Sequence, residues 1–205
     1  LFMVLATVPF PAPAQQAPQS SGAALIEIEN DVAAKRGVGP WQKAEVNLPL
    51  TAGDKVKTGR KSRAAVRLQD RSVWRLDQLS LFEVAATAVE IKRGAGYMFN
   101  REKDQEMRVN TPAANGALRG TMLLVRVTPA LTTLMTVFEG QVELSNAQGR
   151  LILNSGEQGE VEIGRAPRKT AVINAVNILQ WALYYPAVLD PQELAMSAGE
   201  ERAVA

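Results

Sequence analysis

The sequence predicts an all-β protein with two packed sheets, a coiled β-helix or a sandwich, followed by a short C-terminal helical extension. From Ala23 to about Ile163 the chain consists of short apolar runs in which apolar and polar residues alternate, as in strands with one buried face. Gly, Asn, Asp and Ser separate these runs, as expected for turns. After Arg165 apolar residues recur at spacings of three and four, which indicates a helix.

Composition excludes several function classes. The 205 residues can build one medium-sized core. Lys and Arg number 23 against 21 Asp and Glu, a net charge of +2, so we expect no nucleic-acid partner. There is no His and no Cys, which removes imidazole bases, thiolate nucleophiles, disulfides and Cys/His zinc sites. We therefore expect no enzyme activity, no catalytic residues, no cofactor and no metal.

The first residues resemble the remnant of a secretory signal. Residues 1–14 form an apolar run that ends in Ala12-Pro13-Ala14, a small-residue site at which cleavage would follow Ala14. Pro9, Pro11 and Pro13 interrupt the run well short of the roughly 20 residues of a membrane-spanning helix. We expect an exported bacterial protein of the periplasm or cell envelope without a stable membrane span; a buried or disordered tail is the alternative.

The predicted β domain covers residues 23–165, after a polar linker over residues 15–22. Side chains of opposite type alternate along its strands, so we expect one buried and one solvated face. The apolar set includes Val66, Leu68, Trp74 and Leu76, and the opposite set includes Arg63, Arg67 and Arg75.

The predicted helical extension covers residues 170–205. Val172, Val176, Leu179 and Leu183 form one helical face within Ala171–Tyr185, and Pro186 ends it. Asp190-Pro191-Gln192-Glu193 has the residues of a second helix start. We expect the aromatic residues at the end of the first helix to pack against the β domain or the next helix: Trp181, Tyr184 and Tyr185.

Five segments occur in the order seen in one bacterial family. They are Leu50–Gly59, with Gly53-Asp54 and Thr58-Gly59; Ser62–Ser80, with Asp70, Ser72 and Leu76; Ile91, Gly94 and Phe99; Val109–Pro112 with Arg119-Gly120-Thr121; and Val137, Glu139-Gly140, Val142, Leu153 and Gly156-Glu157. Together these motifs resemble the periplasmic domain of the FecR family, over about half of the chain.

The resemblance implies a compact coiled β domain that binds a protein partner in the cell envelope or senses a ligand. FecR proteins of the iron-transport type carry a cytoplasmic segment that controls a sigma factor, then a membrane helix, and end in a small signal-receiving domain. In this sequence we expect an export remnant before the β domain and two helices after it. Val176–Pro186 is similar to the junction where such domains precede tetratricopeptide repeats.

A belt of basic residues is the candidate binding surface: Arg60, Lys61, Arg63, Arg67, Arg71 and Arg75. Within it, Arg63, Arg67 and Arg75 could hold an acidic protein partner, an anionic glycan or a lipid phosphate. The alternative is a solvated strand face on which Asp70 and Asp77 neutralise part of the charge.

Other residues suggest weaker hypotheses. Glu27, Glu29 and Asp31 could line one strand face and bind a hard cation. Asp54 and Asp70 could be the acid and base of a glycan-acting enzyme, and the domain could also be a spacer that binds nothing. We expect Trp41 and Trp74 in the core, and turns at Gly53, Gly94, Gly120, Gly140 and Gly156.

Overall fold

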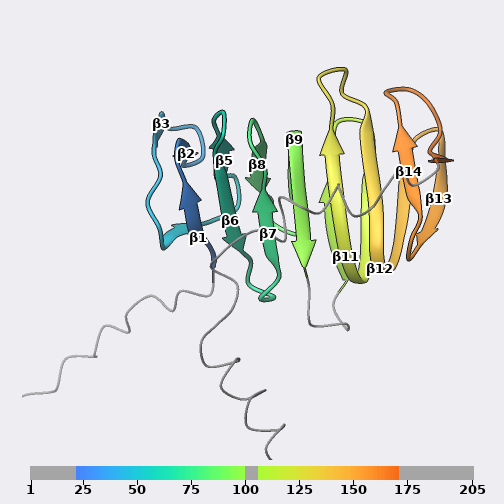
Figure 1. Cartoon of the computed structure of the whole chain (residues 1–205), viewed down its shortest axis with the longest axis horizontal. Helices are drawn as coiled ribbons and strands as arrows, with labels where there is room; N and C mark the ends of the chain where they lie inside the picture. Colours follow the sequence, from blue (N-terminus) through green and yellow to red (C-terminus); the bar gives the residue numbers. More distant parts are fainter. Residues whose placement is uncertain (1–21, 100–105, 171–205) are drawn as a thin grey trace, which may run out of the picture.

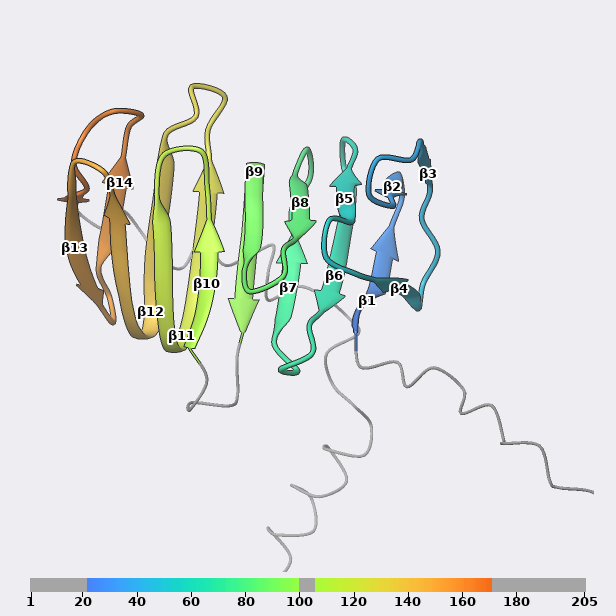
Figure 2. The same cartoon turned by 180° about the vertical axis from the view of Figure 1, so that it is seen from behind.

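The computed structural model describes residues 22–99 and 106–170, which form fifteen strands and no helix (Figures 1 and 2). Hydrogen bonds link all fifteen strands into one continuous sheet. Three long strands run through both halves of this sheet: β9 (Val89–Phe99), β11 (Asn115–Val127) and β12 (Thr133–Asn146). The all-β class predicted from the sequence is confirmed.

The long strands divide the sheet into two layers, because each half of a long strand has different neighbours. The first sheet has the order β4-β1-β6-β7-β9-β11-β12-β14-β15 and uses the C-terminal halves of β9 and β11 and the N-terminal half of β12. Its short strands are β1 (Ala23–Glu29), β4 (Leu48–Leu50), β6 (Arg63–Arg67), β7 (Val73–Leu76), β14 (Gln158–Val161) and β15 (Arg168–Thr170).

The second sheet has the order β3-β2-β5-β8-β9-β10-β11-β12-β13 and uses the other halves of the long strands. Its short strands are β2 (Val32–Lys35), β3 (Trp41–Lys43), β5 (Lys55–Thr58), β8 (Leu81–Val84), β10 (Glu106–Asn110) and β13 (Gly149–Asn154). The pairing of β9 with β10 is parallel, and all the others are antiparallel.

Each long strand bends at a glycine where it passes from one sheet to the other. Gly94 in β9, Gly120 in β11 and Gly140 in β12 all have positive φ, which only glycine adopts without steric cost. The bend in β9 is sharp: a Cβ on Gly96 would lie 2.8 Å from Cδ1 of Ile91 in the same strand. The chain thus folds back on itself at these points, and the two sheets face each other.

The core lies between the two sheets. Trp74 of β7 and Phe82 of β8, in opposite sheets, pack with ring centroids 6.0 Å apart, and both are fully buried. The inward side chains of both sheets form a single cluster, which includes Leu25, Val56, Ile91, Leu123, Val142 and Leu153. The predicted two-sheet arrangement with one core is therefore present.

The remaining predictions of chain organisation concern the two ends of the chain. The signal remnant over residues 1–14 and the helix over Ala171–Tyr185 lie outside the described residues. Residue 170, which the sequence assigned to the helical extension, is the last residue of β15.

Candidate partner-binding surface

The three arginines singled out in the sequence lie on the outward side of the first sheet. Arg63 and Arg67 are the ends of β6, and Arg75 is in the neighbouring strand β7. Ala65 is opposite Arg75 in the register, and Arg67 is opposite Val73. Because Arg63, Ala65 and Arg67 alternate with inward residues, the three arginines share one face.

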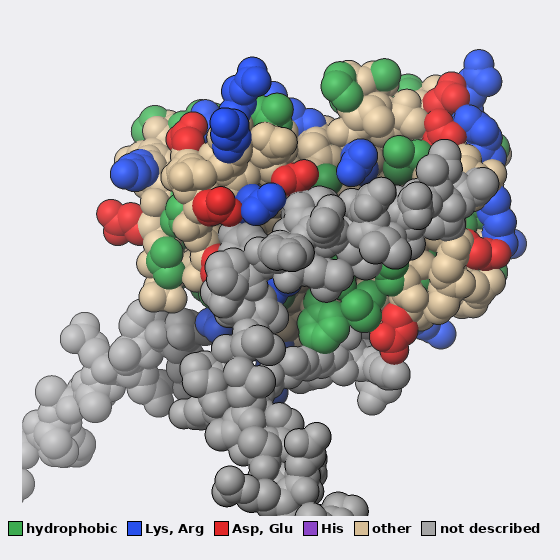
Figure 3. Space-filling model, viewed as in Figure 1, with side chains coloured by type: hydrophobic (Ala, Val, Ile, Leu, Met, Phe, Trp, Pro, Cys, Tyr) green, Lys and Arg blue, Asp and Glu red, His purple; other side chains and the backbone are tan. Residues whose placement is uncertain are grey.

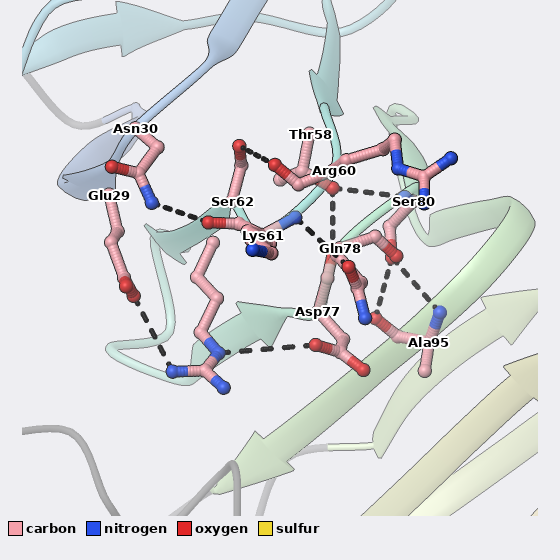
Figure 4. Close-up of polar contacts among 11 residues, drawn as sticks. Glu29, Asn30, Thr58, Arg60, Lys61, Ser62, Asp77, Gln78, Ser80 and Ala95 are labelled. Atoms are coloured by element: carbon pink, nitrogen blue, oxygen red, sulfur yellow. Dashed lines mark hydrogen bonds and ion pairs between the residues drawn. The ribbon is translucent and has the colours of Figure 1, made fainter.

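The three arginines have different surroundings on this face. Arg63 lies 3.5 Å from the Glu29 carboxylate and 3.9 Å from the Asp77 carboxylate (Figure 4), so part of its charge is neutralised. Arg67 is exposed and forms no ion pair with the described residues. It therefore offers the more accessible cation to an anionic partner.

Arg75 lies between two ionisable groups, the half-buried Glu27 and the buried Tyr97. Burial raises the pKa of Glu27, and the charge of Arg75 opposes that rise. Burial also raises the pKa of Tyr97, which pairs with Arg75 across β7 and β9, and Arg75 again acts in the opposite direction. The charge of Arg75 therefore acts on two groups within the sheet, Glu27 and Tyr97.

The corner beside Arg63 is held by hydroxyl groups that bridge neighbouring chain segments (Figure 4). Thr58 Oγ1 donates to the Asp77 carbonyl at 2.6 Å and accepts from the Ser80 amide at 2.9 Å. Ser80 Oγ donates to the Ala95 carbonyl and accepts from the Ala95 amide, both at 3.0 Å. These bonds join the corners after β5 and β7 to the bend in β9.

A second set of bonds orients the turn Arg60-Lys61-Ser62 at the same corner, in which Arg60 and Lys61 are exposed and Ser62 is buried. Ser62 Oγ donates to the Arg60 carbonyl at 2.9 Å and accepts from the Asp31 amide at 3.0 Å. The Lys61 amide donates to Gln78 Oε1 at 2.9 Å, and the Asn30 side-chain amide donates to the Lys61 carbonyl. The backbone leading into Arg63 is therefore fixed on both sides.

The outward face of the first sheet is not solvated throughout, which corrects the expectation of one buried and one wet face. Ala65, between Arg63 and Arg67, is fully buried. Outward residues of β9, β11 and β12 form a second apolar cluster, which we call the outer strip: Ala95, Tyr97, Phe99, Met122, Leu124 and Phe138. Tyr97 and Leu124 are only 2% and 3% exposed.

The two carboxylates considered as a catalytic pair accept hydrogen bonds that hold turns of the chain. Asp54 is buried and accepts hydrogen bonds from the Thr51 amide at 2.9 Å, the Thr51 hydroxyl at 3.1 Å and the Gly37 amide at 3.0 Å. Asp70 accepts from the Ser72 amide at 3.0 Å and its hydroxyl at 2.6 Å. These bonds give both residues structural roles, and Asp70 has no ion pair with the basic belt among the described residues.

The acidic residues considered for a cation do not form one row. Glu27 and Glu29 are outward residues of β1, opposite Ala65 and Arg63. Asn30 has positive φ and turns the chain, so Asp31 lies beyond the strand. Within residues 22–99 and 106–170 no cluster of three or more acidic side chains could hold a metal ion.

The two tryptophans differ in burial. Trp74 is in the core as predicted, but Trp41 is 37% exposed in the edge strand β3, which corrects its assignment to the core. The Lys57 ammonium lies 4.4 Å from the centroid of the Trp41 ring, close enough for a cation–π contact.

Charge on the first sheet is mixed. Figure 3 shows Lys and Arg side chains interspersed with Asp and Glu side chains on this face. Arg168 pairs with Glu160 at 2.7 Å, and Lys169 pairs with Glu157 at 2.6 Å. Arg67 in β6 and Arg126 in β11 are exposed cations of this sheet that form no ion pair with a described residue.

A polar groove of about 750 Å³ lies on the outward side of the second sheet. It is lined by Glu106, Arg108, Asn110, Asn115, Arg119 and Glu143, among others. Both of its arginines pair with Glu106, Arg108 at 3.5 Å and Arg119 at 3.9 Å. Its cations are thus partly neutralised within the groove.

Comparison with known proteins agrees with this fold. Residues 54–143 match the model of the family described as FecR protein. A crystal structure of a candidate anti-sigma factor from Parabacteroides distasonis ATCC 8503 is similar over 65% of this chain and 65% of that chain, with a TM-score of 0.54 and 19% identity. The chain therefore spans about two-thirds of the length of that protein.

A second crystal structure of a candidate anti-sigma factor from the same organism matches with a TM-score of 0.50 and 18% identity, over 57% of this chain and 59% of that chain. At these identities the likeness concerns the fold. No curated protein matches the chain. In the part of the chain that the structure describes, no helix is long and apolar enough to cross a membrane.

Proposed function

Because residues 54–143 match the FecR family model, we propose that this chain is a non-enzymatic regulatory module of the bacterial cell envelope that binds a protein partner through the outward face of the first sheet. The matched segment contains all three candidate arginines and the hydrogen-bonded corner that positions Arg63. The observation that supports the proposal is that the family segment includes Arg67, an exposed cation in the strand that follows this hydrogen-bonded corner.

The proposed partner presents acidic side chains to Arg67 and to the rim of the face near Arg63. Arg67 is exposed, whereas a partner's carboxylate at Arg63 would have to compete with Glu29 and Asp77. A guanidinium binds a carboxylate through two parallel hydrogen bonds. A periplasmic location and a place in front of tetratricopeptide repeats belong to the same proposal, supported by the export-type N-terminus and the helical pattern after Arg165.

Charge reversal at one position tests the partner. Arg67→Glu should reduce retention of the partner from an envelope extract of the producing bacterium by about tenfold or more, since losing a charged contact costs about 1.5–3 kcal/mol. Arg150→Glu, at an exposed position of β13 in the other sheet, is the matched control and should leave retention unchanged.

Equal retention by both variants would contradict the proposal. If no protein is retained but Arg67→Glu abolishes binding to dextran sulfate, the ligand is an anionic glycan instead of a protein. If neither is bound by the wild-type chain, the domain is a spacer.

A further inference from the structure

One end of the second sheet carries a concentration of positive charge. Between Val32 and Thr58 the chain has five basic residues and two acidic ones, of which Glu45 is exposed and Asp54 is buried. Four of the basic residues are lysines, which we call the lysine edge: Lys35, Lys43, Lys55 and Lys57. Among the described residues only Lys55 of this set forms an ion pair, with Glu83 at 3.1 Å. The lysine edge therefore keeps most of its charge.

The register places the four lysines on the outward face of this sheet. Lys35 in β2 is opposite Lys55 in β5, and Ala33 in β2 is opposite both Lys43 in β3 and Lys57 in β5. Ala33 and Lys35 alternate with buried residues of β2, so they and their partners point away from the core. The order β3-β2-β5 thus brings cations from three strands onto one face.

The turn between β2 and β3 exposes apolar side chains beside these cations. Val38 in the turn is fully exposed, and Trp41, the first residue of β3, is exposed with the Lys57 ammonium over its ring. The Gly37 amide donates to the buried carboxylate of Asp54 at 3.0 Å, which fixes the turn. Figures 1 and 2 place β2 and β3 at one end of the molecule, and among the described strands β3 pairs with β2 alone. Val38 and Trp41 are therefore open to a large partner.

Exposed apolar side chains beside lysines suit the surface of an anionic phospholipid bilayer. Tryptophan prefers the boundary between acyl chains and headgroups, and lysines are attracted to the diffuse negative charge of an anionic leaflet. The carboxylates of a protein are bound best by the planar fork of an arginine. The lysine edge instead presents point charges on flexible stems, a composition that favours a lipid surface over an acidic protein.

We propose that the lysine edge binds the surface of an anionic phospholipid bilayer, with Val38 and Trp41 inserted among the headgroups. The contact lies on the second sheet and uses none of the residues proposed to bind the protein partner. It therefore stands or falls independently of the role of Arg67 on the first sheet.

Flotation of the full chain with phospholipid vesicles tests the contact. Vesicles of phosphatidylcholine that contain phosphatidylglycerol should retain the chain more strongly than vesicles of phosphatidylcholine alone, and added salt should weaken this retention. Lys43→Glu should lower retention about tenfold or more, because one basic residue near an anionic surface contributes about fivefold and the variant also adds a repelled charge. Arg150→Glu makes the same charge change at an exposed position of β13, at the other end of this sheet, and should leave retention unchanged.

Val38→Ser tests the insertion separately from the charge. It should lower retention about fivefold, because the valine no longer leaves water for the headgroup region. Ile152→Ser, at an exposed position of β13, is the matched control and should preserve retention. Val38 and Lys43 are both exposed, so neither variant should alter urea unfolding.

Retention that is absent, or that is insensitive to Lys43→Glu or to Val38→Ser, would overturn the proposal, because another part of the chain or charge alone would then account for the binding. Equal losses in the control variants would overturn it as well. If vesicles retain nothing but Lys43→Glu removes a protein recovered from an envelope extract, the lysine edge binds an acidic protein and the membrane contact is wrong.

Discussion

Gly140 is a position at which a single added methyl group should strongly destabilise the fold. Its φ is +88°, and a Cβ there would lie 2.4 Å from the Gly120 carbonyl oxygen and 2.7 Å from the Arg119 carbonyl oxygen. Both contacts are with backbone, which cannot rotate away. Left-handed backbone costs a non-glycine residue about 1–2 kcal/mol, and overpacking costs about 1–3 kcal/mol more. We expect Gly140→Ala to lower the free energy of unfolding by about 3 kcal/mol.

Gly156→Ala is the matched control, because Gly156 has a similar φ of +82° but open space around the added Cβ. It should lower the free energy of unfolding by only about 1–2 kcal/mol. The gain from a stiffer unfolded chain is common to both variants and cancels in the comparison. Urea unfolding followed by circular dichroism measures both values. Equal losses would refute the inference that close packing of neighbouring bends holds the two sheets together.

Three further predictions concern single side chains. Asp54→Ala should lower the free energy of unfolding by about 2–4 kcal/mol, because it leaves the Thr51 and Gly37 amides without their acceptor; a loss under 1 kcal/mol in urea unfolding would contradict this role. Trp74→Ala should cost about 3–5 kcal/mol, whereas Trp41→Ala, at the exposed edge, should cost under about 1 kcal/mol, and similar thermal shifts for both would be inconsistent with the fold. Burial raises the pKa of Glu27 above its ordinary 4.5, so in the interval above pH 4.5 the folded chain holds a proton that the unfolded chain has lost. The free energy of unfolding should therefore fall as pH rises through this interval. Glu27→Gln should flatten this slope in a series of urea unfolding curves, and an unchanged slope would count against the burial of Glu27.

The all-β class and the corners could be predicted from the sequence, because alternation and glycine have direct geometric meanings. Gly53, Gly94, Gly120, Gly140 and Gly156 all have positive φ, as predicted. The sequence could not show that three of them bend a continuous strand while the others separate strands. A glycine between two alternating runs has the same pattern in both cases, and only the pairing of each half-strand with different neighbours distinguishes them.

The outer strip was missed, although the sequence carries a signal for it. Leu123-Leu124-Val125 is apolar at both parities, a pattern typical of strands covered on both faces. Tyr97 alternates with Gly96 and Met98, so neither parity is polar there. The assignment of Trp41 to the core failed for a different reason, since local apolar neighbours do not reveal that β3 is an edge strand.

The candidate arginines could be predicted to share a face but not to differ in accessibility. Their spacing of four and eight residues gives the same parity. The pairing of Arg63 with Glu29 depends on β1 lying beside β6, a contact between segments far apart in the chain. Arg67 therefore emerges as the principal candidate only from the structure.

Photo-cross-linking in intact cells tests the binding role of this face most directly. A photoreactive amino acid at position 67 should yield one dominant covalent complex with an envelope protein, and the same residue at position 150 on the other sheet should yield none. Complexes of equal abundance at both positions, or a complex at position 150 alone, would contradict the assignment of the partner to the first sheet.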